Sequence, residues 1–348
     1  MRIKLCALLL ALAAGCSSPA PSTSTATPTA TGTTPAAQPT GGAFALEAAY
    51  EQVITQVMPS IVQINTKVGL GSGIVYDTAG HIVTNAHVVG QATQLEVTLA
   101  TGGASRPAEL VASFPAGDLA VIKVSDATGL RPAKFADSAK ARVGQIVLAM
   151  GNPLGLSGSV TNGIISALGR TVSEPPPGGV IANAIQTSAA INPGNSGGAL
   201  VNLSAEVVGI PTLAATNPEL GDSAAPGIGF AIPSNTATDI AGQIIKDGKV
   251  TNTHRAALGI QGSGVIGPEG RPLGVQVVSV VPNGGAEQAG IKPGDIILSV
   301  NGVETPTMGA LAEVLAGLQP GDQAKVEIIR PDGSTTTVTV TLGELQAE

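Results

Sequence analysis

Short runs of β-branched and other apolar residues dominate the middle of the chain, and turn residues separate them. Examples of these turns are Thr78-Ala79-Gly80 and Gly151-Asn152-Pro153. The 46 glycines and 25 prolines, about a fifth of the 348 residues, suit short strands and tight turns and disfavour a helical bundle. Such spacing predicts a sandwich or a pair of β-barrels. The runs are 60–65, 73–76, 81–84, 94–98, 119–124, 146–150, 159–167, 200–201 and 207–210.

Two helices are predicted beside these strands. Apolar residues recur at helical spacing from Leu46 to Val57, which predicts an amphipathic helix that ends near Pro59. Residues 234–246 form a second predicted helix, with Ser234 as its N-cap. The glycine-rich segment 69–73 has no helix after it, so we expect close strand packing or a turn rather than a dinucleotide loop.

The composition excludes several classes of protein. A formal net charge of -7, with 12% charged residues, argues against a nucleic acid or an anionic membrane bound by a basic face. Two cysteines are too few for a zinc ribbon or a disulfide framework. The chain is 43% apolar, enough to bury a core, and its length predicts two domains plus tails.

The N-terminus predicts export. Arg2 and Lys4 precede a short apolar run that ends in small residues before Cys16, as in a secretory signal peptide of residues 1–15. The last residues of this run resemble a bacterial lipobox, which implies that Cys16 is lipidated. The alternative is an ordinary cleaved signal in which Cys16 is incidental. Residues 16–43 are rich in Ser, Thr, Pro and Ala. Because such a segment cannot bury enough apolar area to offset the entropy lost on ordering, we expect it to be a disordered tether.

Three separate segments carry the signature of a hydrolase. Ser196 stands in Gly194-Asn195-Ser196-Gly197-Gly198, and glycines permit the tight turn and free amides that acyl transfer requires. His87 follows an apolar strand, and histidine is the usual general base near neutral pH. Asp118 opens an apolar strand, from which a carboxylate can orient an imidazole. Singly, each residue also fits a structural role; together they stand in the chymotrypsin order His, Asp, Ser.

At these residues the sequence resembles the HtrA (Deg) family of serine proteases, over residues 44–345. The resemblance implies a mostly β protein: a chymotrypsin-like double β-barrel at 44–250, followed by a PDZ domain, a small β-barrel with two helices, at 251–345. The matching stretches are 71–73, 84–89, 118–124, 186–202 and 229–234.

The resemblance also implies a role for each site residue. Ser196 is the expected nucleophile, with His87 as base and then acid and Asp118 as the group that orients it. The backbone amides of Gly194 and Ser196, with Asn195 between them, form the expected oxyanion hole. Because no carboxylate lies near Ala190 and Ile191, we expect a substrate pocket for small aliphatic side chains.

Two departures from the family pattern qualify this resemblance. Ser188 stands where the family usually has Asp, which leaves the details of the substrate-side loops open. The connection 67–71 is short where some members carry a long loop that builds large cages, so a homotrimer is expected instead.

The C-terminal region resembles a PDZ domain of the HtrA type. It carries Ala-Gly-Ile-x-Pro-Gly-Asp-x-Ile at 289–297, followed by Asn301-Gly302. Leu258-Gly259-Ile260 matches the family's carboxylate-binding loop, whose amides capture a peptide C-terminus while the peptide adds as a strand. The residue before this loop is Ala257 rather than the frequent aromatic, which leaves affinity and ligand choice open. The alternative is a PDZ domain with only a structural role.

The other two histidines are expected to be incidental. His81 falls in a predicted strand, half-buried or exposed, and His254 falls in a polar hinge. Neither has a partner at metal-ligand spacing, so we expect no metal and no cofactor.

The resemblance implies an ATP-independent serine endopeptidase that cleaves misfolded or unfolded extracytoplasmic proteins. The expected location is the periplasmic or cell-surface side of a bacterial membrane, with the protein anchored through lipid at Cys16. The expected partners are unfolded proteins, peptides and peptide C-termini, and no nucleic acid. Two alternatives stay open: a non-proteolytic chaperone or peptide-binding scaffold, and a regulatory protease of one signalling substrate.

Overall fold

The computed structural model describes residues 41–66, 69–92, 94–152, 158–173, 179–192, 194–217 and 223–346. The predicted signal sequence, Cys16 and most of the predicted tether lie outside these residues. The described residues from Ala45 onward belong to one compact unit. Helix α1 (Gly41–Val57) includes the last three residues of the predicted tether, 41–43, and is followed by the 3₁₀ helix η1 (Met58–Ser60). No helix among the described residues is long and apolar enough to cross a membrane.

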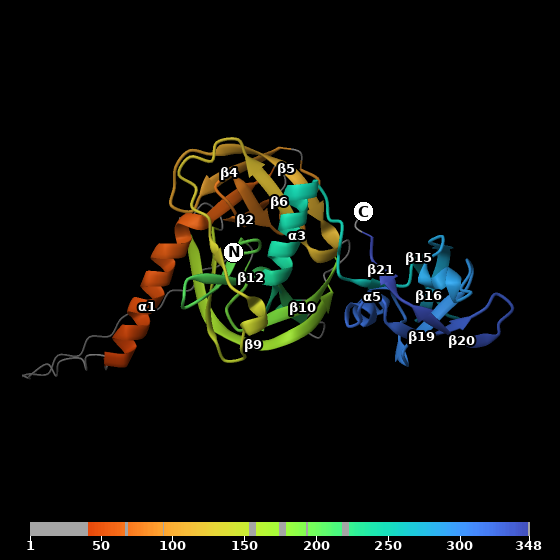
Figure 1. Cartoon of the computed structure of the whole chain (residues 1–348). Coiled ribbons are helices and arrows are strands. Elements are labelled where there is room, and N and C mark those ends of the chain that lie inside the picture. Colours follow the sequence, from red (N-terminus) through yellow and green to blue (C-terminus); the bar gives the residue numbers. More distant parts are fainter. Residues whose placement is uncertain are drawn as a thin grey trace, which may run out of the picture. The chain divides into compact units, whose positions relative to one another are not determined.

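Six strands close into a first barrel in the order β1-β2-β3-β6-β5-β4 (Figure 1). Gly71 and Gly73 lie in β2, where a Cβ at Gly73 would come within 2.6 Å of the Ile82 side chain. The glycine-rich segment therefore serves close strand packing. The strands are β1 (Ile61–Asn65), β2 (Leu70–Val75), β3 (His81–Thr84), β4 (Leu95–Leu99), β5 (Arg106–Phe114) and β6 (Leu119–Val124).

A second barrel follows, with strands in the order β11-β8-β9-β10-β13-β12. Antiparallel pairing of β12 with β11 closes it, and β7 adds to β12 in parallel. The strands are β7 (Lys134–Phe135), β8 (Ile146–Gly151), β9 (Ser159–Ser173), β10 (Val180–Thr187), β11 (Ala199–Asn202), β12 (Glu206–Asn217) and β13 (Ser223–Pro233). The double barrel predicted from the sequence is confirmed.

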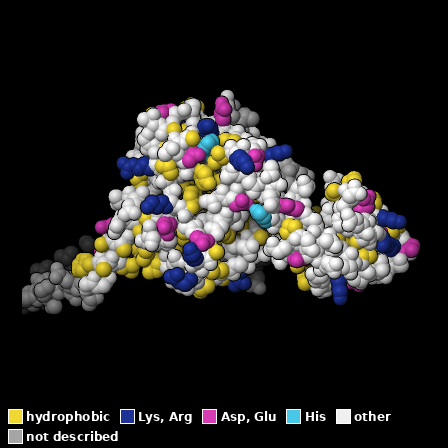
Figure 2. Space-filling view, viewed as in Figure 1, with side chains coloured by type: hydrophobic (Ala, Val, Ile, Leu, Met, Phe, Trp, Pro, Cys, Tyr) yellow, Lys and Arg dark blue, Asp and Glu magenta, His cyan; other side chains and the backbone are white. Residues whose placement is uncertain are grey.

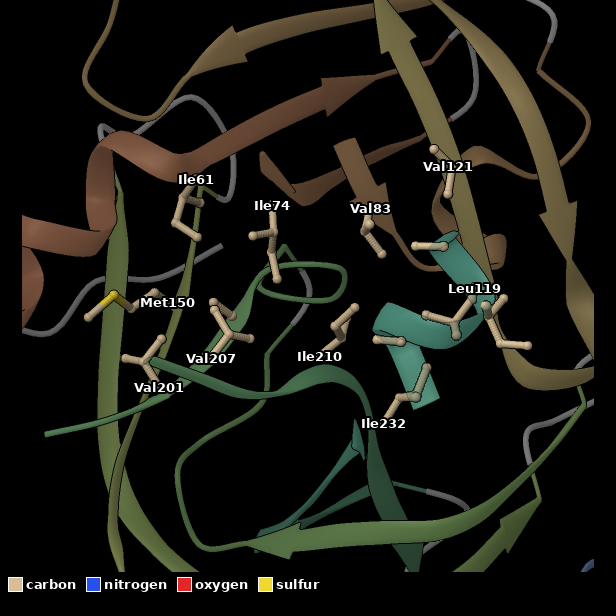
Figure 3. Close-up of a cluster of buried hydrophobic side chains, with 14 of the residues drawn as sticks. Ile61, Ile74, Val83, Leu119, Val121, Met150, Val201, Val207, Ile210 and Ile232 are labelled. Atoms are coloured by element: carbon tan, nitrogen blue, oxygen red, sulfur yellow. The ribbon is translucent and has the colours of Figure 1, made fainter. Parts of the chain in front are cut away.

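The largest buried cluster joins the two barrels (Figure 3). Side chains of the first barrel such as Ile61, Ile74 and Leu119 pack with Met150 and Ile210 of the second. All five are at most 1% exposed, and burying each such side chain contributes roughly 1.5–3 kcal/mol. This shared core fixes the first barrel, which carries His87 and Asp118, against the second, which carries Ser196.

Helix α3 (Ser234–Asp247) packs its apolar face on this core through Ile240 and Ile244. Its N-cap is Pro233, so the prediction of Ser234 as the N-cap is wrong. The Ser234 hydroxyl instead donates to the Ala136 carbonyl oxygen at 2.7 Å, because it is fully buried and needs a partner there.

The C-terminal region has its own core and forms a PDZ fold. Its sheet has the order β15-β16-β17-β19-β20, with β18 beside β17. Helices α4 (Gly285–Gln288) and α5 (Met308–Ala316) accompany it, and α5 contributes Leu311 to the core. The strands are β14 (Ala256–Ala257), β15 (Ile260–Ile266), β16 (Pro272–Val280), β17 (Ile296–Val300), β18 (Val303–Glu304), β19 (Gln323–Ile329), β20 (Thr335–Thr341) and β21 (Gly343–Glu344).

The surface carries charges of both signs. On the face shown in Figure 2, Lys and Arg side chains are dispersed among Asp and Glu rather than gathered in one patch.

Candidate active site

His87 projects from a single-turn helix, α2 (Ala86–Val89), that begins directly after β3. Val88 and Val89 anchor this turn in the core of the first barrel. The His87 side chain faces outward and is 46% exposed. The strand-to-helix junction therefore presents one imidazole at the surface on a fixed support.

Asp118 lies beneath His87 and is 1% exposed. It follows the 3₁₀ turn η2 (Pro115–Gly117) with a left-handed φ of 50°. Its carboxylate oxygens lie 2.9 and 3.0 Å from His87 Nδ1, and Oδ1 also accepts the His87 backbone N–H at 3.0 Å. The Asn85 side chain donates to the Asp118 carbonyl oxygen at 3.0 Å. A carboxylate can only accept here, so Nδ1 carries the proton and Nε2 is left as the acceptor.

Thr212, which was not identified from the sequence, links Asp118 to Ser196. Its hydroxyl donates to Asp118 Oδ2 at 2.5 Å, and its backbone carbonyl oxygen accepts from Ser196 Oγ at 2.9 Å. His87, Asp118 and Ser196 are thus gathered where the barrels meet. Nothing in the local sequence distinguishes Thr212 from the other threonines; only the pairing of β12 brings it here.

The loop that carries Ser196 has two glycines with left-handed backbone angles, Gly194 (φ 106°) and Gly197 (φ 78°). A Cβ at Gly197 would lie 2.3 Å from the Ser72 carbonyl oxygen, so only glycine fits there. The Asn195 N–H donates to the Asn192 carbonyl oxygen at 3.1 Å. Of the three residues expected in the oxyanion hole, the N–H groups of Gly194 and Ser196 make no hydrogen bond within the described residues. Asn195 instead supports the loop.

Ala190 and Ile191 lie just before this loop. Two donors hold the Ala190 carbonyl oxygen, Thr161 Oγ1 at 2.8 Å and Asn195 Nδ2 at 3.1 Å. Ile191 is 9% exposed and packs against Gly229, where a Cβ would lie 2.3 Å from Ile191 Cγ1. The Ile191 side chain therefore fills the space that the missing side chain of Gly229 leaves.

His81 is buried, at 9% exposure, and the expectation of a half-buried or exposed side chain is wrong. Its Nδ1 lies 2.6 Å from Asp77 Oδ2. Burial raises the pKa of Asp77, but hydrogen bonds from the side chain and backbone of His81 and from the Ala79 amide outweigh it and lower this pKa overall. The pair closes the β2–β3 turn. His254 lies near Asp239, with His254 Nε2 and Asp239 Oδ2 3.2 Å apart.

In the PDZ fold, Leu258, Gly259 and Ile260 line a groove of about 470 Å³. Gly259 has a left-handed φ of 78°, and Leu258 is buried in the core. Apolar side chains of α5 line the same groove, among them Met308, Leu311 and Leu315.

Comparison with known proteins matches two regions of the chain to known domain families. The trypsin-like peptidase domain family matches residues 71–210, and the PDZ domain family matches residues 245–342. The serine protease PepD of Mycobacterium tuberculosis is 38% identical over 342 residues, which cover 89% of this chain and 72% of PepD. The periplasmic serine endoprotease DegP of Escherichia coli is 40% identical over 284 residues, which cover 78% of this chain and 56% of DegP.

Solved structures agree with these relatives. A serine endoprotease from Yersinia pestis is 37% identical with a TM-score of 0.57, and the match covers 85% of this chain and 98% of that one. The HtrA-type protease AlgW with a tripeptide is 33% identical with a TM-score of 0.58. The fold and these similarities define a trypsin-like serine protease with a PDZ domain. The chain belongs to the HtrA family of serine proteases.

Proposed function

We propose that the chain is an ATP-independent endopeptidase in which Ser196 is the nucleophile, His87 the general base and Asp118 the group that orients it. The observation that carries this proposal is the bonded sequence from His87 Nδ1 to the Asp118 carboxylate, to the Thr212 hydroxyl, and from the Thr212 carbonyl to Ser196 Oγ. A buried carboxylate that holds Nδ1–H leaves Nε2 as the acceptor for the serine proton.

In the proposed reaction Ser196 Oγ attacks the peptide carbonyl carbon and its proton passes to His87 Nε2. The oxygen of the tetrahedral intermediate gains a negative charge, and the amides of Gly194 and Ser196 stabilise it. His87 then protonates the leaving amine. Water deprotonated by the same imidazole hydrolyses the acyl ester and restores Ser196.

We propose unfolded or misfolded extracytoplasmic proteins as the substrates. Ser196 lies where the two barrels pack together, so an extended, unfolded segment reaches its hydroxyl more easily than a compactly folded one. The test compares the cleavage of one protein in its native and its reduced, unfolded form. We expect the unfolded form to be cut and the native form to persist; a chaperone or scaffold would bind the unfolded form without cutting it. Cleavage of neither form, or equal rates for both, would contradict the proposal.

The substrate pocket is proposed to accept small aliphatic side chains because Ile191 occupies the space beside Gly229. Ile191→Ala should deepen the pocket and shift the preference before the cut bond from Val or Ala toward Leu or Met by about tenfold or more. The measurement is kcat/KM on a matched peptide set. Ile165→Ala removes the same atoms from the same apolar cluster and should leave the preference unchanged. Preferred cleavage after Lys or Arg would refute this pocket.

The PDZ groove is proposed to bind the free C-terminus of an apolar peptide at Leu258, Gly259 and Ile260. Hydrogen bonds to a charged group contribute about 1.5–3 kcal/mol, so amidation of the peptide should weaken binding by about tenfold or more. Titration of the full chain carrying Ser196→Ala with acid and amide forms of one peptide measures this. Equal affinities of the acid and amide forms would exclude capture of the peptide carboxylate by this loop.

The anchor and the assembly are further proposals. The relative DegP is named a periplasmic protease, which supports an extracytoplasmic location. Lipidation of Cys16 would hold the chain on the outer side of a bacterial membrane, and the short 67–71 connection supports a homotrimer. Cys16→Ser should move the protein from the membrane to the soluble fraction, with light scattering of that form giving a trimer mass. A wild-type protein found in the soluble fraction would contradict the anchor.

A further inference from the structure

The Ser72 hydroxyl lies at the point where the first barrel contacts the Ser196 loop. Ser72 is a β2 residue in Gly71-Ser72-Gly73 and is fully buried. Its Oγ donates to the Gly194 carbonyl oxygen at 2.5 Å and accepts the backbone N–H of Asn152 at 2.8 Å. The Ser72 hydroxyl thus donates its proton to the Ser196 loop and accepts a hydrogen bond from Asn152, directly after β8.

The backbone of Ser72 holds the same loop at a second point. Its N–H donates to the Ser196 carbonyl oxygen at 3.0 Å. The Thr84 hydroxyl, from the end of β3, donates to the Ser72 carbonyl oxygen at 2.7 Å. Ser72 therefore donates hydrogen bonds to the carbonyl oxygens of Gly194 and Ser196, on both sides of Asn195. Thr84, at the end of the strand that precedes His87, in turn holds the Ser72 carbonyl.

The contacts of Ser72 fix peptide planes that adjoin those of the two candidate oxyanion donors. In a planar trans peptide the carbonyl and the next N–H point in opposite directions, so a fixed carbonyl fixes that N–H. Ser72 fixes the Gly194–Asn195 plane at its carbonyl, and the Asn195 N–H to Asn192 fixes the other end. The Asn195 carbonyl accepts the Gly198 N–H at 3.0 Å, which orients the N–H of Ser196. Only the plane that carries the Gly194 N–H lies outside this set.

We propose that Ser72 is a positioning residue for the oxyanion hole. Its hydroxyl holds the Gly194 carbonyl and with it the Gly194–Asn195 peptide plane, and this fixed plane together with the φ of 106° at Gly194 limits the directions in which the Gly194 N–H can point toward the developing oxyanion. Without the hydroxyl, the Gly194 carbonyl and the Asn152 N–H each lose a partner, and the loop can turn to satisfy them elsewhere. The inference rests on the proposed protease function and adds a determinant of transition-state stabilisation outside the triad.

The same hydroxyl joins the hole to the segment after β8. Asn152 is 3% exposed, and its side-chain Oδ1 accepts the Gly158 N–H at 3.1 Å, just before β9. One oxygen atom of Ser72 therefore connects the Asn152 N–H with the Gly194 carbonyl.

The test is Ser72→Ala, measured on a short peptide substrate and on a peptide boronate that forms a tetrahedral adduct with the nucleophile. Removing an oxyanion donor outright costs about 10²–10³-fold in kcat, so loss of its positioning should cost at least about tenfold. KM should stay within about twofold, and boronate affinity should fall with kcat/KM, because only transition-state binding is lost. A structural defect that lowers the amount of folded enzyme would also lower kcat at constant KM, but it would leave the boronate affinity of the remaining folded enzyme unchanged, so the boronate separates the two cases.

Ser234→Ala is the matched control, because Ser234 is equally buried and donates one hydrogen bond to a carbonyl far from the loop. It should lower the melting temperature as Ser72→Ala does and leave kcat unchanged. Should Ser72→Ala fail to fold, Ser72→Cys keeps the volume with a weak donor and is judged by the same criteria. A fall in kcat of less than about tenfold, or a rise in KM alone, overturns the proposal. An inactive wild-type enzyme would instead contradict the proposed function.

Discussion

Asp118→Asn is expected to lower kcat/KM by about 10⁴-fold while the protein stays folded. The Asp118 carboxylate accepts the His87 N–H, His87 Nδ1–H and the Thr212 hydroxyl. The asparagine side chain has only one oxygen acceptor, and its NH₂ group would face N–H or O–H groups that donate to the carboxylate in the wild type. His87 can meet that NH₂ only by shifting its proton to Nε2, and the imidazole then cannot accept the proton of Ser196. Steady-state kinetics on a peptide substrate measures the loss.

Asp77 supplies the control for this substitution within the same barrel. It also accepts from a histidine Nδ1, that of His81, and from backbone amides. Because its pKa is lowered in the folded state, ionised Asp77 stabilises the fold above its ordinary pKa of 3.8, and this contribution is lost as pH falls below that value. Asp77→Asn should therefore reduce stability near neutral pH and leave kcat/KM intact. Equal losses of activity in both variants would deny Asp118 a special role.

Ser196→Ala is expected to reduce proteolysis to background, a loss of about 10⁶-fold. The substitution removes the only oxygen of this side chain and leaves the backbone amides of the loop in place. Binding of an unfolded protein should persist, because the pocket at Ile191 and the PDZ groove are untouched. Gel analysis over a long incubation measures the rate, and a binding assay on the same sample shows that the site is intact.

Ser204→Ala tests whether the loss is specific. Ser204 is exposed in the turn after β11, only eight positions along the chain. Its replacement should change neither cleavage nor binding. Residual cleavage by Ser196→Ala above about 1% of the wild-type rate would show that another group performs the attack.

The three candidate catalytic residues could be proposed from the sequence because each lies near a strongly apolar strand: His87 after β3, Asp118 directly before β6 and Ser196 shortly before β11. Strands β1, β3 and β6 are nearly all buried and read as β-branched runs. The predicted strands missed β5, β10 and β13. β13 contains Pro and Gly, β10 has a bulge after Ile181, and β5 has Pro107 near its start, so local propensity is weak there. Pairing with partners far along the chain determines these strands.

The roles of the supporting residues of the site could not be predicted from the sequence either, because they too depend on partners far along the chain. Thr212 and Ser72 act through contacts with residues 94 and 122 positions away, at Asp118 and Gly194. A threonine in an apolar strand and a serine between glycines are both common, and neither carries a spacing that predicts these partners. Both hydroxyls find their partners only when the chain folds and buries them, because a buried hydroxyl needs a hydrogen-bond partner.

Covalent labelling tests the central claim, that Ser196 is a nucleophile activated by His87, most directly. The protein is treated with a fluorophosphonate, digested, and the labelled peptide is identified by mass spectrometry. We predict one adduct per chain, on Ser196, formed in the wild type and in Asp77→Asn but not in His87→Ala. An adduct on a different serine, or an unlabelled enzyme that still cleaves unfolded protein, would contradict the account.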